Sequence, residues 1–495
     1  MNRFHKGAIA VHPAYGRGTI TALRCNGFEV RLSFGTFSLW VPARDLTPAQ
    51  GGLRLVGQDG DGEPGAARTD RKPLEAILRL LQGDRAPAAG TGPAPAAGRP
   101  SSAVEPRYRP TRSDRPVEDA AVLESFRLGL VPTPQISEWT VGREEEVARI
   151  RDFLRDEAEG AILVEGAYGA GKSHLLQYLA RDALGLGYAV AAAGFDPSEA
   201  SAAFPKKAYR RLVAGFQATV AGQPADFRGF LRAVAADRAW EEVLGDHRLL
   251  APFLGRLAAG SADEDDWDWI EARGRGCESR PTLHDYSTCA NIYCNLLSAL
   301  GRAAVEVAGL AGLVVLLDEA EVARSVMYRY QAARGMNFFR GLVMTANDDP
   351  VLLEEGLVRA GVTEGADSRL IYSGHNPVRY TAGIPSHLKV AFALTPGSLQ
   401  DEFRRCRESI QVIPLDVLSM DQLRDLFGRV CDRFESVCGV RLLQRDRDRL
   451  FRLLASSDRV TSTRAFIKAA IEALDYIRFY PSGDVAQMIG GGYGG

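Results

Sequence analysis

The segment that most constrains the fold is a glycine-rich octapeptide, Gly166-Ala167-Tyr168-Gly169-Ala170-Gly171-Lys172-Ser173. It lies between a short apolar run, 161–165, and a run with apolar residues at helical spacing, 174–180. In such a strand–loop–helix unit the backbone N–H groups of the loop turn toward an anion at the helix N-terminus. We therefore expect this loop and His174 to hold a nucleoside triphosphate, with Lys172 on the β- and γ-phosphates and Ser173 on Mg²⁺.

A second apolar run, 313–317, ends in two carboxylates, Asp318 and Glu319. Beside a phosphate-binding loop, this order predicts that Asp318 holds Mg²⁺ opposite Ser173 and that Glu319 polarises the attacking water. Glu321 follows and is expected to orient the site or to pair with an arginine. The alternative is a strand that merely ends in acidic residues. Because the two motifs lie far apart for a compact core, we expect a helical insertion at about 204–308.

Four short motifs give the second part of the chain a specific resemblance. They are Val-Gly-Arg-Glu at 141–144, the glycine loop, Leu-Leu-Asp-Glu-Ala-Glu at 316–321 and Ala-Phe-Ala-Leu-Thr at 391–395. Together they resemble the BREX-system ATP-binding family of the BrxC/BrxD type, over roughly residues 120–480. The resemblance implies an AAA+/STAND-like ATPase of bacterial anti-phage defence, often encoded beside a helicase, that uses ATP and Mg²⁺.

The resemblance also suggests roles by position. Val141 and Gly142 are expected beside the adenine, and Thr395, at the end of an apolar run, is expected to contact the γ-phosphate or the attacking water. Arg464 is expected to reach the nucleotide from a helical lid. One of three later arginines is expected to be an arginine finger that completes the site of a neighbouring subunit, which implies a homo-oligomer. The three candidates are Arg404, Arg405 and Arg407, and for each of them the alternative is a basic helix end.

The N-terminal residues have a different pattern, with short apolar runs separated by turn residues and Asn26-Gly27 between two of them. This dipeptide between strand-like runs is a strong hairpin signal, and several short strands predict a small, bent all-β barrel. The stretch from Val11 to Ile20 resembles the Tudor/SH3-like modules of UvrD-type helicases and CarD-type transcription factors. Such modules bind proteins or nucleic acid, and we expect a docking module without chemistry of its own.

The expected fold class is therefore an α/β P-loop NTPase with a parallel sheet, a helical insertion and a C-terminal helical lid, preceded by a small SH3/Tudor-like barrel. The linker between them is rich in Pro, Ala and Gly and is too poor in large apolar residues to form a core, although 73–81 has a short helical pattern. The expected boundaries are 1–50 for the barrel, 51–118 for the linker, 119–415 for the ATPase core, 416–485 for the lid and 486–495 for a flexible glycine-rich tail.

The composition limits the kinds of partner and of structural cross-link that we expect for the chain. The formal net charge of −2 gives no global basic footprint, so any contact with DNA must be local, for example at the arginines around Tyr108. The seven cysteines include no C-x-x-C pair, which argues against a disulfide framework or a structural zinc site. No run is long and apolar enough to span a membrane, so a cytoplasmic protein is expected.

Three functions stay open at this point. The first is an ATPase that remodels a DNA-associated complex together with a helicase or another defence protein. The second is a STAND-like nucleotide switch in which slow hydrolysis times a signalling state. The third is a scaffold in which the ATP site is only structural.

Overall fold

The computed structural model describes residues 116–195, 202–274, 283, 288–324, 329–397, 403, 410–439, 441–457, 462–480, 483, 485 and 489, together with 9–12, 16–24, 29–33, 38–42 and 47–48 near the N-terminus. The chain divides into two compact units, residues 1–100 and 101–495. Several predictions concern residues outside these ranges: the helix at 73–81, the basic stretch around Tyr108, the C-terminal tail, and the arginine-finger candidates Arg404, Arg405 and Arg407.

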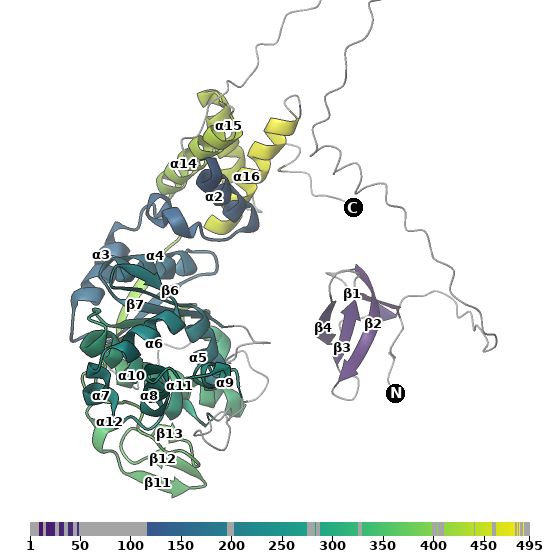
Figure 1. The fold of residues 1–495 in the computed structure, drawn as a ribbon. Coiled ribbons are helices and arrows are strands. Elements are labelled where there is room, and N and C mark those ends of the chain that lie inside the picture. Colours follow the sequence, from purple (N-terminus) through teal and green to yellow (C-terminus); the bar gives the residue numbers. More distant parts are fainter. Residues whose placement is uncertain are drawn as a thin grey trace, which may run out of the picture. The chain divides into compact units, whose positions relative to one another are not determined.

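The first unit contains a five-stranded antiparallel sheet in the order β4-β3-β2-β1-β5 (Figure 1). Its strands are β1 (Ile9–His12), β2 (Gly16–Arg24), β3 (Glu29–Ser33), β4 (Ser38–Pro42) and β5 (Thr47–Pro48). The run from Val11 to Ile20 thus spans the β1–β2 hairpin, and Ile20 is buried. The expected antiparallel strands are present, whereas closure into a barrel and the docking role stay predictions.

The second unit is organised around a seven-stranded sheet in the order β15-β6-β14-β10-β7-β8-β9. The first five strands in this order pair in parallel: β15 (Gln411–Leu415), β6 (Ala161–Gly166), β14 (Leu388–Leu394), β10 (Leu313–Asp318) and β7 (Ala189–Gly194). Strand β14 therefore separates β6, which leads into the glycine loop, from β10, which ends in Asp318. Both strand ends lie at the carboxyl edge of the sheet, where ligands bind in open α/β folds.

Helices cover both faces of this sheet, because alternate side chains of each buried strand point to opposite sides. On one face, Ile162 and Val164 of β6 pack with α3 (Glu144–Arg155) and α4 (Lys172–Gly185). On the other face, Leu163 belongs to a large core that contains α10 (Ala290–Arg302) and α11 (Arg329–Ala346). The expected α/β class with a mostly parallel sheet is thereby confirmed.

The stretch between β7 and β10 is mostly helical, as expected, and adds an antiparallel hairpin that the sequence analysis missed. Its helices are α5 (Pro205–Ala214), α6 (Phe227–Ala236), α7 (Ala239–Leu244), α8 (Leu250–Ala258), α9 (Glu264–Ile270), α10 and η4 (Ala303–Val307). Strands β8 (Phe216–Val220) and β9 (Gln223–Ala225) extend the sheet beside β7. Ala221 and Gly222 form the turn between them, with φ of 50° and 76°, and two positive φ values match the twist of a tight hairpin.

Between β10 and β14 the chain forms η5 (Ala320–Arg324), α11, α12 (Val351–Glu354) and a separate three-stranded antiparallel sheet. The strands of this small sheet are β11 (Leu357–Ala360), β12 (Val362–Gly365) and β13 (Ile371–Tyr372), and no sequence pattern had indicated them. They lie at the opposite end of the unit from the C-terminal helices (Figure 1). They therefore do not contribute to the site described below.

The C-terminal helices form the expected helical lid and include one unexpected member. Helices α14 (Met420–Cys438), α15 (Gln444–Ala455) and α16 (Thr463–Phe479) share a core with α2 (Pro116–Leu128), which precedes the sheet in the sequence (Figure 1). Arg127 of α2 is paired with Asp475 of α16 at 2.8 Å. Ser419 and Ser462 cap the N-termini of α14 and α16, and Ser419 forms a capping box.

Among the residues that the structure describes, no helix has the length and apolarity needed to cross a membrane.

Candidate nucleotide-binding site

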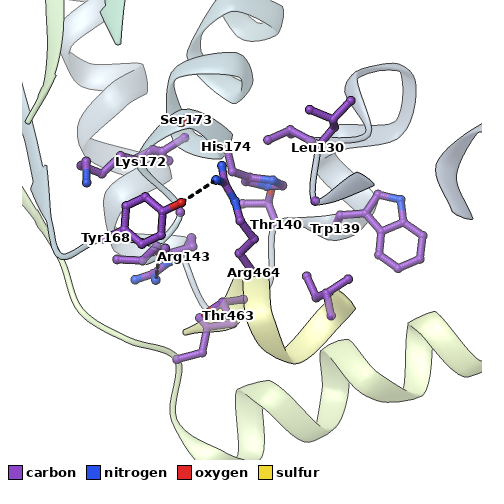
Figure 2. Close-up of a pocket in the computed structure, with 18 of the residues that line it drawn as sticks. Leu130, Trp139, Thr140, Arg143, Tyr168, Lys172, Ser173, His174, Thr463 and Arg464 are labelled. Carbon is purple, nitrogen blue, oxygen red and sulfur yellow. Dashed lines mark hydrogen bonds between the residues drawn. The ribbon is translucent and has the colours of Figure 1, made fainter. Parts of the chain in front are cut away.

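A cavity of about 320 Å³ lies between the carboxyl edge of the sheet and the lid (Figure 2). One end is formed by the glycine loop and the carboxylates that follow β10, and we call it the phosphate end after the role predicted for the loop. The other end is mostly apolar, and we call it the base end after the role predicted for Val141. The residues at the phosphate end are Tyr168, Gly169, Ala170, Gly171, Lys172, Ser173, His174, Asp318, Glu319 and Glu321, with Arg464 beside them.

The glycine loop has the expected local structure. Strand β6 ends at Gly166 and α4 begins at Lys172. Gly169 and Gly171 have φ of 78° and 107°, in the region that side chains rarely adopt, so glycine is required at both positions. The Lys172 Nζ donates to the carbonyl oxygens of Gly166 (2.9 Å) and Ala167 (3.2 Å). The Lys172 side chain thus lies along the glycine loop and is held there by two backbone carbonyl groups.

The two carboxylates occupy the turn after β10. Asp318 Oδ1 accepts a hydrogen bond of 2.9 Å from the backbone N–H of Glu319. Glu319 has φ of 54°, a left-handed conformation that costs a non-glycine residue of order 1 kcal/mol or more and that recurs at functional sites. Thr395 does not line the cavity, but its hydroxyl donates to Glu321, which does. The structure thus brings Thr395 to the site through Glu321.

The oxygen donors at the phosphate end suit a magnesium ion. Ser173 and Asp318 come from different strand–helix units and line the same cavity. Within the described ranges, no group of three or more His, Cys, Asp or Glu side chains could enclose a metal by itself. Mg²⁺ in nucleotide sites takes only one or two protein ligands and completes its shell with phosphate oxygens and water. Ser173 and Asp318 therefore fit a Mg²⁺ ion that enters with the nucleotide.

The base end is built from segments that are distant in the sequence. Trp139, at the end of η3 (Thr133–Trp139), packs edge-to-face on Phe126 of α2, with ring centroids 4.7 Å apart. No pattern in the sequence indicated this wall, because Phe126 and Trp139 come from different elements. Val141 lines the cavity as expected, whereas Gly142 does not. The residues that line this end are Phe126, Leu130, Val131, Pro132, Trp139, Thr140, Val141, Leu418, Leu426 and Ile467.

Arg143, in the Val-Gly-Arg-Glu motif, is a further residue of the site, and no pattern in the sequence indicated its role. Its side chain is nearly buried; it pairs with Glu146 at 2.8 Å and donates to the carbonyl oxygens of Ala170 (3.0 Å) and Asp416 (2.6 Å). It thereby joins the glycine loop to the segment that leads into the lid. Gly142 beside it has φ of 62°, and a Cβ there would lie 2.2 Å from the Gln422 side chain of α14.

His174 lies between the two ends of the cavity, on the first turn of α4. Its Nε2 is 2.8 Å from Thr140 Oγ1. Burial, together with the nearby positive charge of Arg143, lowers the pKa of His174 to about 4. The ring is therefore neutral at physiological pH.

Arg464 reaches the phosphate end from the first turn of α16. Its Nη1 donates to the Tyr168 hydroxyl at 3.3 Å, and its guanidinium carbon lies 5.7 Å from the centre of the Tyr168 ring (Figure 2). Tyr168 is itself 75% exposed. The lid arginine thus contacts the glycine loop directly.

Fold and site together define the class of protein: an α/β P-loop NTPase whose cavity lies between a parallel sheet and a helical lid. Comparison with known families gives a match to part of the chain. Residues 115–228, from α2 past the glycine loop, match the family model "BREX system ATP-binding protein BrxC/D". The resemblance inferred from the short motifs is confirmed over that segment.

Solved structures with detectable similarity include domain III of the Thermotoga maritima replication initiation protein DnaA, at 10% identity and a TM-score of 0.32, covering 70% of this chain and 90% of that chain. Drosophila ORC bound to DNA matches at 14% identity and a TM-score of 0.35, covering 72% of this chain and 68% of that chain. We draw no functional argument from these two similarities. No curated protein matches the chain.

Proposed function

We propose that this protein is an AAA+-type ATPase that couples hydrolysis of Mg-ATP to the assembly or remodelling of a DNA-associated complex. The observation that carries the proposal is the convergence of Lys172, Asp318 and Glu319 on one cavity, although they come from separate parts of the chain. The name of the family that matches residues 115–228 supports a setting in bacterial anti-phage defence. A helicase or another defence protein as partner rests on that same resemblance.

The chemistry assigned to the site needs few groups. Lys172 and the N–H groups of the loop bind the β- and γ-phosphates, while Ser173 and Asp318 hold Mg²⁺, which neutralises phosphate charge when it is bound. Glu319 takes a proton from the water whose oxygen forms the new bond to the γ-phosphorus. The bond from that phosphorus to the β–γ bridging oxygen breaks, and ADP and phosphate leave. Arg464 from the lid, and one arginine from a neighbouring subunit, add positive charge.

The decisive experiment measures ATP turnover with and without duplex and single-stranded DNA, for the unmodified chain and for Glu319→Gln. We expect DNA to stimulate turnover, and we expect Glu319→Gln to lower it by about 10²- to 10⁴-fold because the base is lost. The variant should still bind ATP, since it keeps Lys172 and Ser173. Sizing of the protein with ATP, with ADP and without nucleotide tests assembly, because an arginine finger in trans requires an oligomer.

Other outcomes favour the other two functions. Slow turnover that DNA does not change, with assembly that depends on the nucleotide, would support a nucleotide switch. An absence of turnover, combined with partner binding that Lys172→Ala leaves intact, would overturn the ATPase proposal and support a scaffold.

A further inference from the structure

The hydrogen bonds around Thr140 determine which nitrogen of His174 carries the proton. Thr140 Oγ1 lies 2.8 Å from the carbonyl oxygen of Ile136 and also 2.8 Å from His174 Nε2. A threonine hydroxyl has a single proton, and a carbonyl oxygen can only accept. Thr140 therefore donates to Ile136, and its oxygen accepts from His174 Nε2–H. In the neutral ring, this leaves Nδ1 as a hydrogen-bond acceptor.

This acceptor belongs to the cavity. His174 lines the cavity, and its Nδ1 has no hydrogen-bond partner in the part of the chain that the structure describes. In Figure 2, His174 and Thr140 lie between Lys172 on one side and the apolar side chains of Leu130 and Trp139 on the other. A nucleotide with its phosphates on the glycine loop and its base among those apolar residues would pass this ring.

We propose that His174 Nδ1 accepts a hydrogen bond from the exocyclic amino group of adenine, so that the site selects ATP against purine nucleotides with a carbonyl at the same position. The inference deepens the proposed function and rests on the nucleotide site assigned there. His174 is the residue that touches the base. Thr140 is a positioning residue, because it fixes the protonated nitrogen and the orientation of the ring.

The selectivity follows from the two possible pairs of groups. The amino group of adenine donates, and so it satisfies Nδ1. The 6-carbonyl of hypoxanthine or guanine accepts, and so it would place two lone pairs opposite each other and leave both groups unsatisfied. A buried acceptor without a donor weakens binding about ten- to a hundredfold.

The test compares the affinities for ATP and for inosine triphosphate, two ligands with the same phosphates and ribose. Their purines differ at C6, where adenine has an amino group and hypoxanthine a carbonyl, and at the adjacent N1, which accepts in adenine and carries a hydrogen in hypoxanthine. Calorimetric titrations in Mg²⁺ buffer would use the unmodified chain, Thr140→Ser, Thr140→Val and His174→Phe. We expect the unmodified chain and Thr140→Ser to prefer ATP by about ten- to a hundredfold. Thr140→Val removes the acceptor for Nε2–H, and His174→Phe removes the ring nitrogens. Both should bring the two affinities within about threefold of each other.

A spectroscopic measurement separates positioning from general damage. Ring ¹⁵N chemical shifts should identify the Nε2–H form of His174 in the unmodified chain and in Thr140→Ser, and a mixture of both forms in Thr140→Val. If His174→Phe does not fold, the affinity ratio in Thr140→Val still decides, since loss of stability alone does not change a ratio between two ligands.

The proposal and the proposed function fail in different ways. If the unmodified chain binds ATP and inosine triphosphate equally, the triphosphate site stands and the role of His174 is overturned. An unchanged preference for ATP in His174→Phe also overturns it. If neither nucleotide binds, the proposed function fails and this inference fails with it.

Discussion

The phosphate end and the base end of the cavity are built in opposite ways. The phosphate end comes from two contiguous motifs, each at the end of a buried parallel strand. The base end combines α2, η3, Val141 and two lid helices, which lie on both sides of the core in the sequence. Phosphate binding needs particular residues at fixed spacing, whereas an apolar wall needs only large side chains that meet in space. The first therefore leaves a motif and the second does not.

Phe126→Ala should have the largest effect and should act on the base end alone. The ring is buried, packs on Trp139 and belongs to the core that joins α2 to the lid. Its loss leaves a cavity, and we expect the free energy of unfolding to fall by about 4 kcal/mol, measured by denaturant titration. Phe479→Ala is the control, because that ring is on α16 but 66% exposed. If Phe126→Ala and Phe479→Ala were equally stable, Phe126 would line the ligand cavity without contributing to the stability of the core.

Lys172→Ala should affect the phosphate end with little change in stability. Removal of a charged donor from bound phosphates should weaken ATP binding about a hundredfold, measured by calorimetry. Lys207→Ala, which removes an exposed lysine from α5, is the matched control and should bind ATP normally. A Lys172→Ala variant that binds ATP as well as the control would refute the assignment of the glycine loop.

Gly142→Ala should have the smallest effect of the three substitutions and should affect both ends of the cavity. The residue has φ of 62°, and its Cβ would collide with the Gln422 side chain, so we expect the free energy of unfolding to fall by about 1–2 kcal/mol. ATP affinity should fall too, because Arg143 follows directly and contacts the glycine loop through Ala170. Gly428→Ala is the control, since a Cβ at that position in α14 meets nothing within 4 Å. Equal losses in the two variants would contradict a special role for Gly142.

The elements that could be predicted from the sequence are those specified by local rules. Strand β6, the glycine loop and α4 were expected within a few residues, and so were β10 with Asp318 and Glu319, because a buried strand followed by such residues is a local pattern. The β8–β9 hairpin was missed because its turn has Ala221 where glycine or asparagine is usual. The packing of α2 on the lid was missed because apolar periodicity shows that a helix face is buried but does not show against what.

The candidate site follows the same division. Lys172, Ser173, Asp318 and Glu319 could be named in advance, since each has a fixed place in a motif. Trp139, Thr140 and the position of Arg143 could not, because their roles depend on contacts between segments far apart in the chain. The hydrogen bond between Thr140 and His174 is an example: neither residue type nor spacing indicates it.

The position of α2 has a mechanical consequence. The chain passes from the lid to the sheet between α2 and α3, and it returns from β15 to α14, so two covalent connections join the bodies. With two connections, a hinge rotation of the lid about the line between them is favoured over a sliding motion. Arg143 lies beside this axis and is bonded to Asp416 at the second connection. Near the axis Val141 would move little, whereas Arg464 is carried by the lid, so a rotation of the lid would change the contact between its charge and Tyr168 of the glycine loop.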